Sequence, residues 1–380
     1  MYVIEWAYWK MVTESKATRL QYDQTQTPAQ IRAMRDVYED EIESSLTFEP
    51  ASDAPKARGP VYEFNDHVME VRAGASEEKR GLITLCFIGG LIPVIVTWAI
   101  ITFGYISLSL SHPKSISVPS ILLDLYMLAV GGIILYLYFR FGFRLTQLEA
   151  LTSRNLLVRL NRTTQQVYLH RPSYCGGIVT LPWKSTASSA TCTQNDAASA
   201  GTRLALVWHP MHTGLPHMEI AFVGKQGQGG SELRDEWEFI RRFMEEGPEG
   251  LPRPRLSTRF PSPIQAFSAQ FEGIGRFFRK SSWLFKVVML MVWPAFVVLG
   301  TCHWVSLMLC WRPRWPKIIR EAGQPGKPIP PLTTLSDYPP EIQKRLLANA
   351  DRWALKPGKR PEKKPRKPRI KKAPEPDTGR

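Results

Sequence analysis

The sequence predicts an α+β membrane protein with a transmembrane helix hairpin, a small antiparallel sheet or barrel closed by a C-terminal helix, a third hydrophobic segment and a disordered basic tail. Three observations predict this class. Charge-free apolar runs are long enough to cross a bilayer. Short strand-like runs follow one another between residues 141 and 247, and the last stretch is rich in Pro, Lys and Arg.

Composition narrows the class further. The chain has 380 residues, with 49 Lys and Arg against 34 Asp and Glu, which gives a formal net charge of +15. Its five cysteines form no CxxC pair, which argues against a disulfide scaffold. The expected parts are a cytoplasmic N-terminal region (1–80), the helix hairpin (81–140), the sheet domain (141–250), a linker with an amphipathic helix (251–282), the third membrane segment (283–311) and the tail (312–380).

The hairpin is predicted from two runs. Gly81–Ser111 holds 31 residues without a charge, and Ser115–Phe139 is interrupted by Asp124 alone. About 20 apolar residues span the hydrocarbon core, and the turn between the runs is short, so the two helices are expected to lie side by side. Asp124 is the intramembrane polar candidate. The alternative is a carboxylate that reaches the interface or bonds within the helix pair.

The basic residues around the hairpin predict its orientation. Lys79 and Arg80 precede it and Arg140 and Arg144 follow it, while the connecting loop holds Lys114 alone. By the positive-inside rule the N-terminus and everything after Arg140 are expected in the cytoplasm.

The third run, Val287–Trp311, has 25 residues without a charge and basic residues on both sides. If it crosses the membrane once, the most cationic part of the chain lies outside. If it is re-entrant and kinked at Pro294, both flanks stay in the cytoplasm. Twenty-five residues are too few for two full crossings. The sequence leaves these two topologies open.

The N-terminal region is expected to hold an amphipathic helix that begins at the capping box Thr27–Gln30, followed by a strand at Val61–Val71. Between the third run and the sheet domain, residues 263–281 place Ile264, Phe267 and Phe271 at helical spacing. This pattern predicts an amphipathic helix on the membrane surface. Packing under the sheet domain is the alternative.

The sheet domain is predicted from its strand signals. Leu156–Leu160 and Gln166–His170 flank a turn at residues 161–164 and so predict a β-hairpin. The remaining expected strands are Ile178–Trp183, Leu204–Trp208 and Met218–Val223, with a polar strand and a variable loop in Ser185–Gly201. Ser231 caps a closing helix, Glu232–Glu246, whose buried face is expected to be Leu233, Trp237, Ile240 and Met244.

The tail, Arg312–Arg380, holds 19 Lys and Arg against seven acidic residues, and 14 of the 31 prolines. Such a composition predicts disorder, with one helical island at Glu341–Lys356. The residues expected to contact the membrane surface or a partner are Trp353, Arg360, Lys363, Lys364, Arg366, Lys367, Arg369, Lys371 and Lys372. We expect Lys356–Lys372 to lie on the cytoplasmic leaflet and to draw the helical island onto it. A tail that is solvated or held on the other side is the alternative.

The sequence holds only weak patterns of metal-binding, phosphate-binding or catalytic residues. His209, His212 and His217 lie between Trp208 and the next strand, without a neighbouring cysteine, and are interpreted as part of a solvated loop and not as a metal site. Gly224–Gly230 lacks the order of a phosphate-binding loop. No catalytic motif is present, so we expect no enzymatic activity, no metal and no cofactor.

The order of these elements carries a resemblance. The two membrane helices, the hairpin, the strand ending in Pro182-Trp183 and the closing helix resemble the pleckstrin-homology-like domains of bacterial membrane proteins. The whole chain is also similar to a family of proteobacterial inner-membrane proteins encoded near type VI secretion genes, through Leu157–Arg162, Leu181–Trp183 and Arg242–Pro248. The resemblance implies a multi-pass protein of the bacterial inner membrane and no enzymatic activity.

Three functional classes follow. The first is a membrane-anchored scaffold or adaptor, accessory to type VI secretion, that recruits a protein partner such as a secretion effector. The second is an immunity protein that protects the inner membrane against a secreted toxin. The third, nucleic-acid binding by the tail, is the weakest, because Lys/Arg-Pro repeats without aromatic residues give charge contacts but no base readout. Anionic lipid headgroups are the other expected partner.

Overall fold

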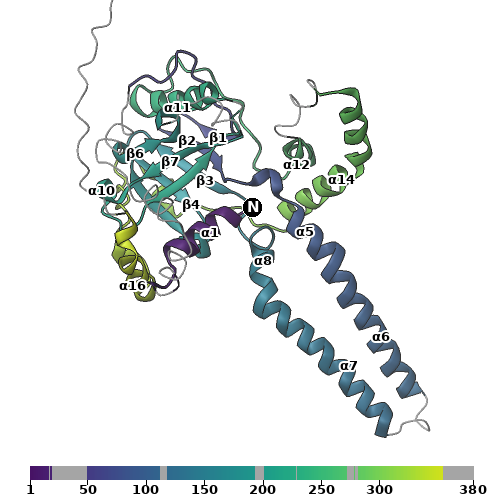
Figure 1. Cartoon of the computed structure of the whole chain (residues 1–380). Coiled ribbons are helices and arrows are strands. Elements are labelled where there is room, and N and C mark those ends of the chain that lie inside the picture. The colour runs from purple at the N-terminus through teal and green to yellow at the C-terminus, as the bar shows by residue number, and fades with distance from the viewer. Residues whose placement is uncertain are drawn as a thin grey trace, which may run out of the picture.

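The computed structural model describes residues 1–16, 18, 49–111, 118–192, 201–227, 229–271, 278 and 281–353, and its architecture is α+β. One antiparallel sheet forms a globular part, and a pair of long apolar helices projects from it (Figure 1). The helix predicted to begin at Thr27 lies outside the described residues.

The sheet has eight strands in the order β5-β4-β3-β2-β8-β7-β6, with β1 paired on β2. The strands are β1 (Val61–Phe64), β2 (Val68–Ala73), β3 (Leu156–Asn161), β4 (Gln166–His170), β5 (Ile178–Pro182), β6 (Thr186–Ser188), β7 (Leu204–Trp208) and β8 (Glu219–Val223). All the pairs are antiparallel. Ala73 and Val223 join β2 to β8, so the sheet consists of two parts, β1–β5 and β6–β8, that meet at this corner.

Most of the strand predictions are confirmed, and one is wrong. The β3–β4 hairpin, β5, β7 and β8 lie where the sequence predicts them. The stretch Val61–Val71, predicted as one strand, instead forms the antiparallel pair of β1 and β2. Its turn forms because the side-chain oxygen of Asn65 accepts hydrogen bonds from the backbone N–H groups of His67 and Val68, at 3.0 and 2.7 Å.

The hairpin is an insertion between two paired strands. β2 precedes it and β3 follows it, and the two strands pair over their whole length, from Val68 with Asn161 to Ala73 with Leu156. The sheet therefore fixes both ends of the hairpin at one place.

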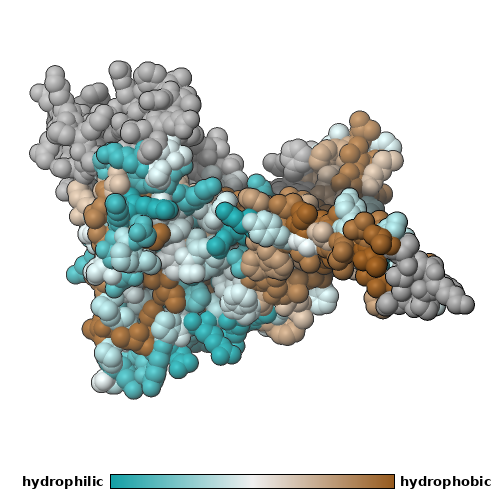
Figure 2. Space-filling model, turned by 90° about the horizontal axis from the view of Figure 1, so that it is seen from below, coloured by the Kyte–Doolittle hydropathy of each residue, from teal (hydrophilic) through white to brown (hydrophobic). Residues whose placement is uncertain are grey.

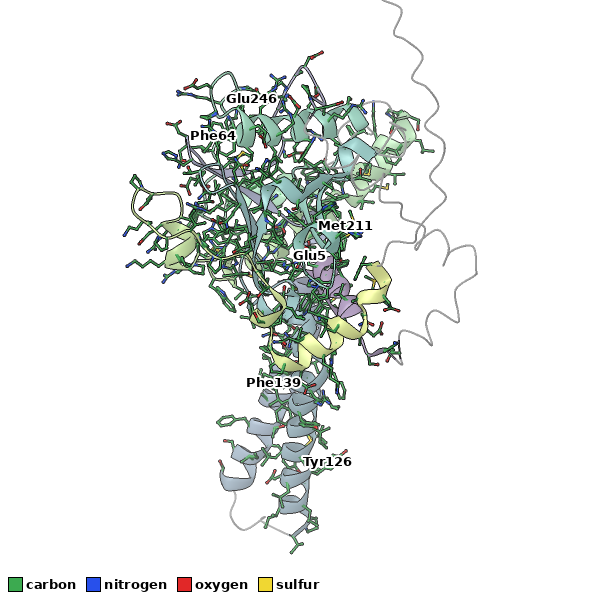
Figure 3. The ribbon with its side chains drawn as sticks, turned by 90° about the vertical axis from the view of Figure 1, so that its left-hand side faces the viewer. Glu5, Phe64, Tyr126, Phe139, Met211 and Glu246 are labelled. Carbon is green, nitrogen blue, oxygen red and sulfur yellow. The ribbon has the colours of Figure 1, made fainter. Side chains whose placement is uncertain are left out.

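The hairpin itself is built of α5 (Leu82–Cys86), α6 (Ile92–Ser111), α7 (Val118–Leu137) and α8 (Phe143–Gln147), with π-helical turns at 87–91 and 138–142. Three helical stretches are long and apolar enough to cross a membrane by length and composition: Glu77–Leu108, Ile121–Gln147 and Trp283–Met308. Tyr126 and Phe139 lie on the hairpin, outside the globular part (Figure 3), and each is 63% exposed. In the view of Figure 2, hydrophobic residues predominate on the right and hydrophilic residues on the left, where smaller hydrophobic patches are also present.

The core lies between the sheet and two helices at its opposite ends (Figure 1). At one end α11 (Gly230–Glu245) buries the predicted face, and Trp237 is packed against Trp183 with ring centroids 5.6 Å apart. At the other end α1 (Val3–Val12) inserts Trp9 and Val12 into the same core. The sequence analysis did not predict α1.

A buried carboxylate from the end of the hairpin caps its first helix. Glu149 is 0% exposed, and its Oε1 accepts hydrogen bonds from the backbone of Gly81 (2.7 Å) and Thr84 (3.2 Å) and from the Thr84 hydroxyl (2.6 Å). Its Oε2 accepts one from the backbone of Ile83 at 3.0 Å. The first backbone N–H groups of a helix have no hydrogen-bond acceptor within the helix. Glu149, 65 positions after Thr84 in the sequence, provides the acceptors for those at the start of α5.

Arg80 ties the same place to the third apolar helix, α14 (Trp283–Met308). Its side chain is 1% exposed and donates hydrogen bonds to Ser306 Oγ (2.7 Å), the backbone oxygens of Arg154 (2.6 Å) and Glu149 (2.9 Å), and Glu77 Oε1 (3.3 Å). We call Glu77, Arg80, Glu149, Arg154 and Ser306 the junction. It connects the sheet domain, the hairpin and α14.

The helix α14 continues through Pro294 but bends along its length (Figure 1), and it pairs with α12 (Pro263–Gln270). Phe271, directly after α12, stacks on Trp293 with centroids 5.1 Å apart. The buried residues of α14 all lie in its C-terminal half, whereas Trp283 and Met291 of the N-terminal half are each 77% exposed. It does not run alongside α6 and α7 (Figure 1).

The prediction that the chain is disordered from Arg312 onward is wrong for residues 312–353, which we call the C-terminal strap. The strap contains α15 (Lys317–Arg320), α16 (Pro340–Ala348) and a final 3-10 turn (Ala350–Trp353). Its first part covers the outer face of β3–β5, where the Asn161 side chain donates to the Ala322 backbone oxygen at 2.9 Å and Thr333 exchanges hydrogen bonds with Thr180.

The second part of the strap closes the end of the domain where α1 lies. Leu346 of α16 is 0% exposed in the main core, and the Asn349 side chain donates to the backbone oxygen of Val12 at 3.0 Å. The described part of the predicted island at Glu341–Lys356, residues 341–353, is thus largely helical, and its buried residue Leu346 packs on the domain. The composition of residues 312–353 favours disorder, but their packing on the domain outweighs this local tendency.

Candidate functional site

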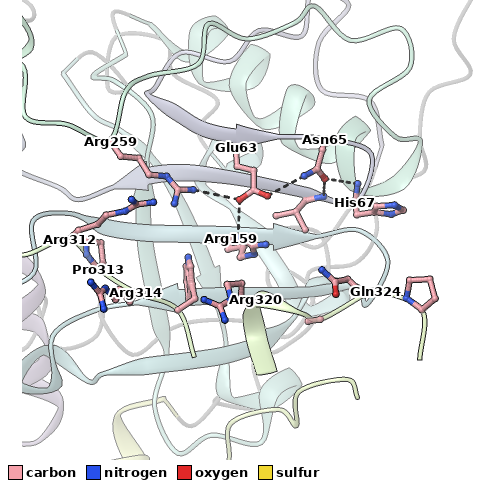
Figure 4. Close-up of a pocket in the computed structure, with 15 residues that line it drawn as sticks. Glu63, Asn65, His67, Arg159, Arg259, Arg312, Pro313, Arg314, Arg320 and Gln324 are labelled. Carbon is pink, nitrogen blue, oxygen red and sulfur yellow. Dashed lines mark hydrogen bonds and ion pairs between the residues drawn. The ribbon is translucent and has the colours of Figure 1, made fainter. Parts of the chain in front are cut away.

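A cleft lined by arginines lies between the outer face of the sheet and the start of the strap (Figure 4). Its volume is about 780 Å³. The charged residues that line it come from β1, β3, the loop before α12 and the strap; they are Glu63, Arg159, Arg259, Arg312, Arg314 and Arg320. We call it the arginine cleft.

Two of these arginines are neutralised by two glutamates. Glu70 of β2 is 0% exposed beneath the cleft, and its carboxylate contacts Arg159 (3.2 Å) and Arg259 (2.9 Å). Glu63 of β1, at the rim, pairs with the same two arginines at 3.0 and 3.6 Å. The side-chain amide of Asn65 also donates to Glu63, at 3.2 Å. These groups form a closed network that builds the cleft wall.

Arg312, Arg314 and Arg320 differ from the wall. All three are exposed, and none forms an ion pair with any residue of the described ranges. They point into the same cleft from the strap, with no interaction drawn to them in Figure 4. The guanidinium group keeps its charge at all physiological pH values and offers a planar fork of donors, so three unpaired guanidinium groups provide a site for anions.

The strap backbone that carries these arginines is held by aromatic contacts. The indole N–H of Trp315 donates to Glu70 Oε2 at 2.8 Å, and its ring meets His170 edge-on with centroids 5.2 Å apart. Burial lowers the pKa of His170, so this imidazole is neutral at pH 7 and adds no charge to the cleft. Ile319 and Ala322 pack on Tyr168 on the same face of the sheet. The positions of the free arginines are therefore fixed by packing.

The arrangement suits a ligand that carries carboxylate or phosphate groups. It does not suit a cation, because both carboxylates of the cleft are already paired with arginines. Within the described part of the chain, no group of three His, Cys, Asp or Glu side chains is placed to hold a metal ion.

Of the residues that the sequence singled out as candidate sites, the structure describes only Trp353 and Asp124. Arg360, Lys363, Lys364, Arg366, Lys367, Arg369, Lys371 and Lys372 are outside the described residues. Trp353 is half-buried at the end of the strap, where its ring lies 6.5 Å from that of Tyr8. Asp124 is half-buried in α7, and its Oδ1 has no hydrogen-bond partner among the described residues.

The three histidines also separate. His209 accepts a hydrogen bond from the Met211 backbone at 3.2 Å, as the cap of a short helix, α10 (Pro210–Thr213). His217 is 1% exposed and contacts Glu219 at 3.0 Å, so its assignment to a solvated loop is wrong. Arg171 forms a two-bond pair with the same carboxylate and holds the pKa of Glu219 at about 2. This buried group joins the ends of β4 and β8.

Sequence reasoning missed the arginine cleft. Its cations are spread over 162 positions, from Arg159 to Arg320, and only the sheet and strap bring them together. The one local signal is the alternation Trp311-Arg312-Pro313-Arg314-Trp315.

Residues 133–324 match the profile of DUF6708, a family of unknown function. The chain belongs to this family. The DUF6708 match begins within α7 and ends in the strap, so it includes all five arginines of the cleft but not Glu63 or Glu70. The chain matches no curated protein and no solved structure.

Proposed function

We propose that this protein is a non-enzymatic, multi-pass protein of the bacterial inner membrane that serves as a scaffold or adaptor, with the arginine cleft as the docking place for an acidic segment of a protein partner. The observation that carries the proposal is the set of three cleft arginines without a counter-ion in the described chain. The link to type VI secretion rests on the resemblance given in the sequence analysis.

The proposal that the globular part is pleckstrin-homology-like is supported by its strand order. Strands β2–β5 form one antiparallel group, β6–β8 form a second, and α11 follows directly and closes one end. The hairpin then occupies the connection between the first two strands of the domain. A membrane anchor in this connection holds the domain at the bilayer without a flexible linker.

The membrane topology is supported by contacts on both sides of each apolar segment. β2 and β3 pair, so the two ends of the hairpin lie on one side of the membrane. α11 precedes α14 and the strap follows it, and both pack on the same sheet domain. A single crossing by α14 would separate them, so we favour the topology in which α14 enters and leaves from the domain side. The basic flanks of the hairpin favour the cytoplasm for that side.

An epitope test examines this topology. A short tag inserted after Ser111 is expected to bind antibody in intact spheroplasts, whereas a tag after the exposed Glu249 is expected to bind only after the membrane is permeabilised. Binding to the Glu249 tag in intact spheroplasts would place the domain outside and overturn the proposed topology.

Peptide binding tests the docking role. Fluorescein-labelled octaglutamate is titrated against the full chain in dodecyl maltoside micelles, and its anisotropy is measured. Charge-assisted hydrogen bonds contribute about 1.5–3 kcal/mol each, so the triple variant Arg312→Gln, Arg314→Gln, Arg320→Gln is expected to raise Kd at least tenfold.

The control variant is Lys184→Gln, Lys344→Gln, Arg345→Gln, which removes the same charge from exposed side chains that do not line the cleft. Equal loss of binding in both variants would mean that octaglutamate binds non-specifically, through the net charge of the protein, and the docking role of the cleft would be rejected. In cells, a photo-crosslinker at Gln324, inside the cleft, is expected to capture a partner that the cleft variant no longer captures.

A further inference from the structure

A second basic cleft lies at the foot of the domain, beside the start of the hairpin. Its volume is about 660 Å³, and it is bounded by the segment before β1, the end of β8, residues 252–257 and α12. Six cationic side chains line it: Lys56, Arg58, Arg72, Lys225, Arg253 and Arg255. None of the described residues that line it is acidic. We call it the foot cleft.

Its positive charge is largely uncompensated. Arg58 pairs with Glu232 at 2.6 Å and donates to the Gln226 backbone oxygen at 3.1 Å. The other five cations form no ion pair with any residue in the described ranges. A cleft lined by one sign of charge concentrates counter-ions, so the foot cleft is an anion site with a stronger charge imbalance than the arginine cleft.

Its surroundings indicate which anion it takes. α12 forms one wall, and Gln270 at its end donates to the backbone oxygen of Arg80, two residues before α5, at 3.1 Å. The segment that carries Arg253 and Arg255 also exposes large apolar side chains: Leu256 is 61%, Phe260 70% and Ile264 78% exposed. Exposed apolar groups among cations, next to an apolar helix hairpin, are typical of a surface that contacts the bilayer interface.

We propose that the foot cleft binds the phosphate of an anionic phospholipid headgroup, with Lys225, Arg253 and Arg255 as its principal ligands and Leu256 and Ile264 against the acyl region. The assignment rests on the membrane insertion of the hairpin proposed above. It differs from the docking role of the arginine cleft in place and in ligand, because no residue lines both clefts and the apolar side chains Leu256, Phe260 and Ile264 are exposed beside the foot cleft.

Native mass spectrometry of the full chain, released from dodecyl maltoside micelles, tests the assignment. The probe is palmitoyl-oleoyl phosphatidylglycerol, compared with the zwitterionic phosphatidylcholine of the same chains and with glycerol 1-phosphate. We expect a saturable phosphatidylglycerol adduct, at least tenfold weaker adducts with phosphatidylcholine, and a Kd for glycerol 1-phosphate at least tenfold higher. Equal binding of glycerol 1-phosphate would assign the cleft to a free phosphate compound and overturn the lipid source.

The variant Lys225→Gln, Arg253→Gln, Arg255→Gln is expected to raise the Kd for phosphatidylglycerol at least tenfold. The matched variant Lys184→Gln, Lys344→Gln, Arg345→Gln removes three charges from exposed side chains that line neither cleft and is expected to change it less than twofold. An equal effect of the two variants would overturn the site. The midpoint of thermal unfolding, measured without lipid, shows that both variants are folded. Lipid binding in micelles does not depend on how the chain crosses a bilayer. The epitope test therefore shows independently whether the proposed membrane topology is wrong.

Discussion

The junction and the arginine cleft both concentrate arginines, but they differ in how the charges are satisfied. In the junction, Arg80 is 1% exposed and donates to four oxygen acceptors. In the cleft, Arg312, Arg314 and Arg320 are exposed, without an ion pair to the described residues. A buried charge with all its partners is part of the structure, because removing one partner leaves the others unsatisfied. Exposed charges contribute little to folding and so are available to a ligand.

Glu149→Ala is expected to have the largest effect. The substitution removes four hydrogen bonds to the start of α5 and leaves buried N–H groups without acceptors. Breaking a buried charged network costs about 3–5 kcal/mol, measured by urea unfolding of the full chain in micelles. Glu149→Gln keeps one acceptor oxygen and is expected to lose less. A loss below about 1 kcal/mol for Glu149→Ala would contradict the structural role of the junction.

Trp237→Ala provides the apolar reference for this comparison. Trp237 is 0% exposed between α11 and Trp183, and truncating a buried aromatic side chain costs about 3–5 kcal/mol. The control is Trp311→Ala, since Trp311 is 60% exposed and is expected to cost less than about 0.5 kcal/mol. Near-UV circular dichroism during urea unfolding measures both. Equal losses for the two substitutions would mean that the predicted face of α11 is not the core.

Glu236 is an intermediate case, a buried carboxylate with incomplete partners. It is 4% exposed, its Oε2 has no hydrogen-bond partner among the described residues, and burial raises its pKa to about 7 although Arg58 acts in the opposite direction. The folded pKa lies above the unfolded value of 4.5, so its contribution to stability is complete below about pH 4.5 and is lost as pH rises to about 7.

Glu236→Gln is therefore expected to stabilise the protein above pH 7 and to have little effect near pH 4.5. A raised pKa of this size corresponds to a gain of up to about 3 kcal/mol, reduced where the amide replaces an acceptor. Urea unfolding at pH 5, 6, 7 and 8 measures the difference between variant and wild type. A difference that does not change with pH would show that Glu236 stays ionised.

The local sequence predicts those elements whose signals are local. The β3–β4 hairpin and the buried face of α11 follow from alternation and helical spacing, and the apolar runs correspond to α6, α7 and α14. The pairing of β2 with β3 could not be predicted, because the hairpin separates them by 82 residues, from Ala73 to Leu156. Nor could α1, whose insertion between the sheet and the strap depends on contacts with Tyr338 and Asn349.

The strap explains why the arginine cleft could not be predicted from the sequence. High Pro and charge content predicts disorder, yet residues 312–353 pack on the domain through Trp315, Ile319 and Leu346, among other contacts. The arginines that the strap carries then meet Arg159 and Arg259 from segments far away in the sequence. Local composition contains no information on such contacts between distant segments of the chain.

The smallest expected effect is that of Arg320→Gln on stability. Arg320 is exposed and unpaired within the described chain, so its loss is expected to change the unfolding free energy by less than about 0.5 kcal/mol, with a slight gain at low salt because repulsion from Arg312 and Arg314 is relieved. Arg159→Gln, in the same cleft, is the contrast: it leaves the buried Glu70 with one arginine fewer and is expected to cost about 1–3 kcal/mol. Urea unfolding at 20 and 300 mM NaCl measures both variants. If Arg320→Gln were as costly as Arg159→Gln, the free arginines would belong to the wall of the cleft, and the cleft would have no unpaired charge to offer a partner.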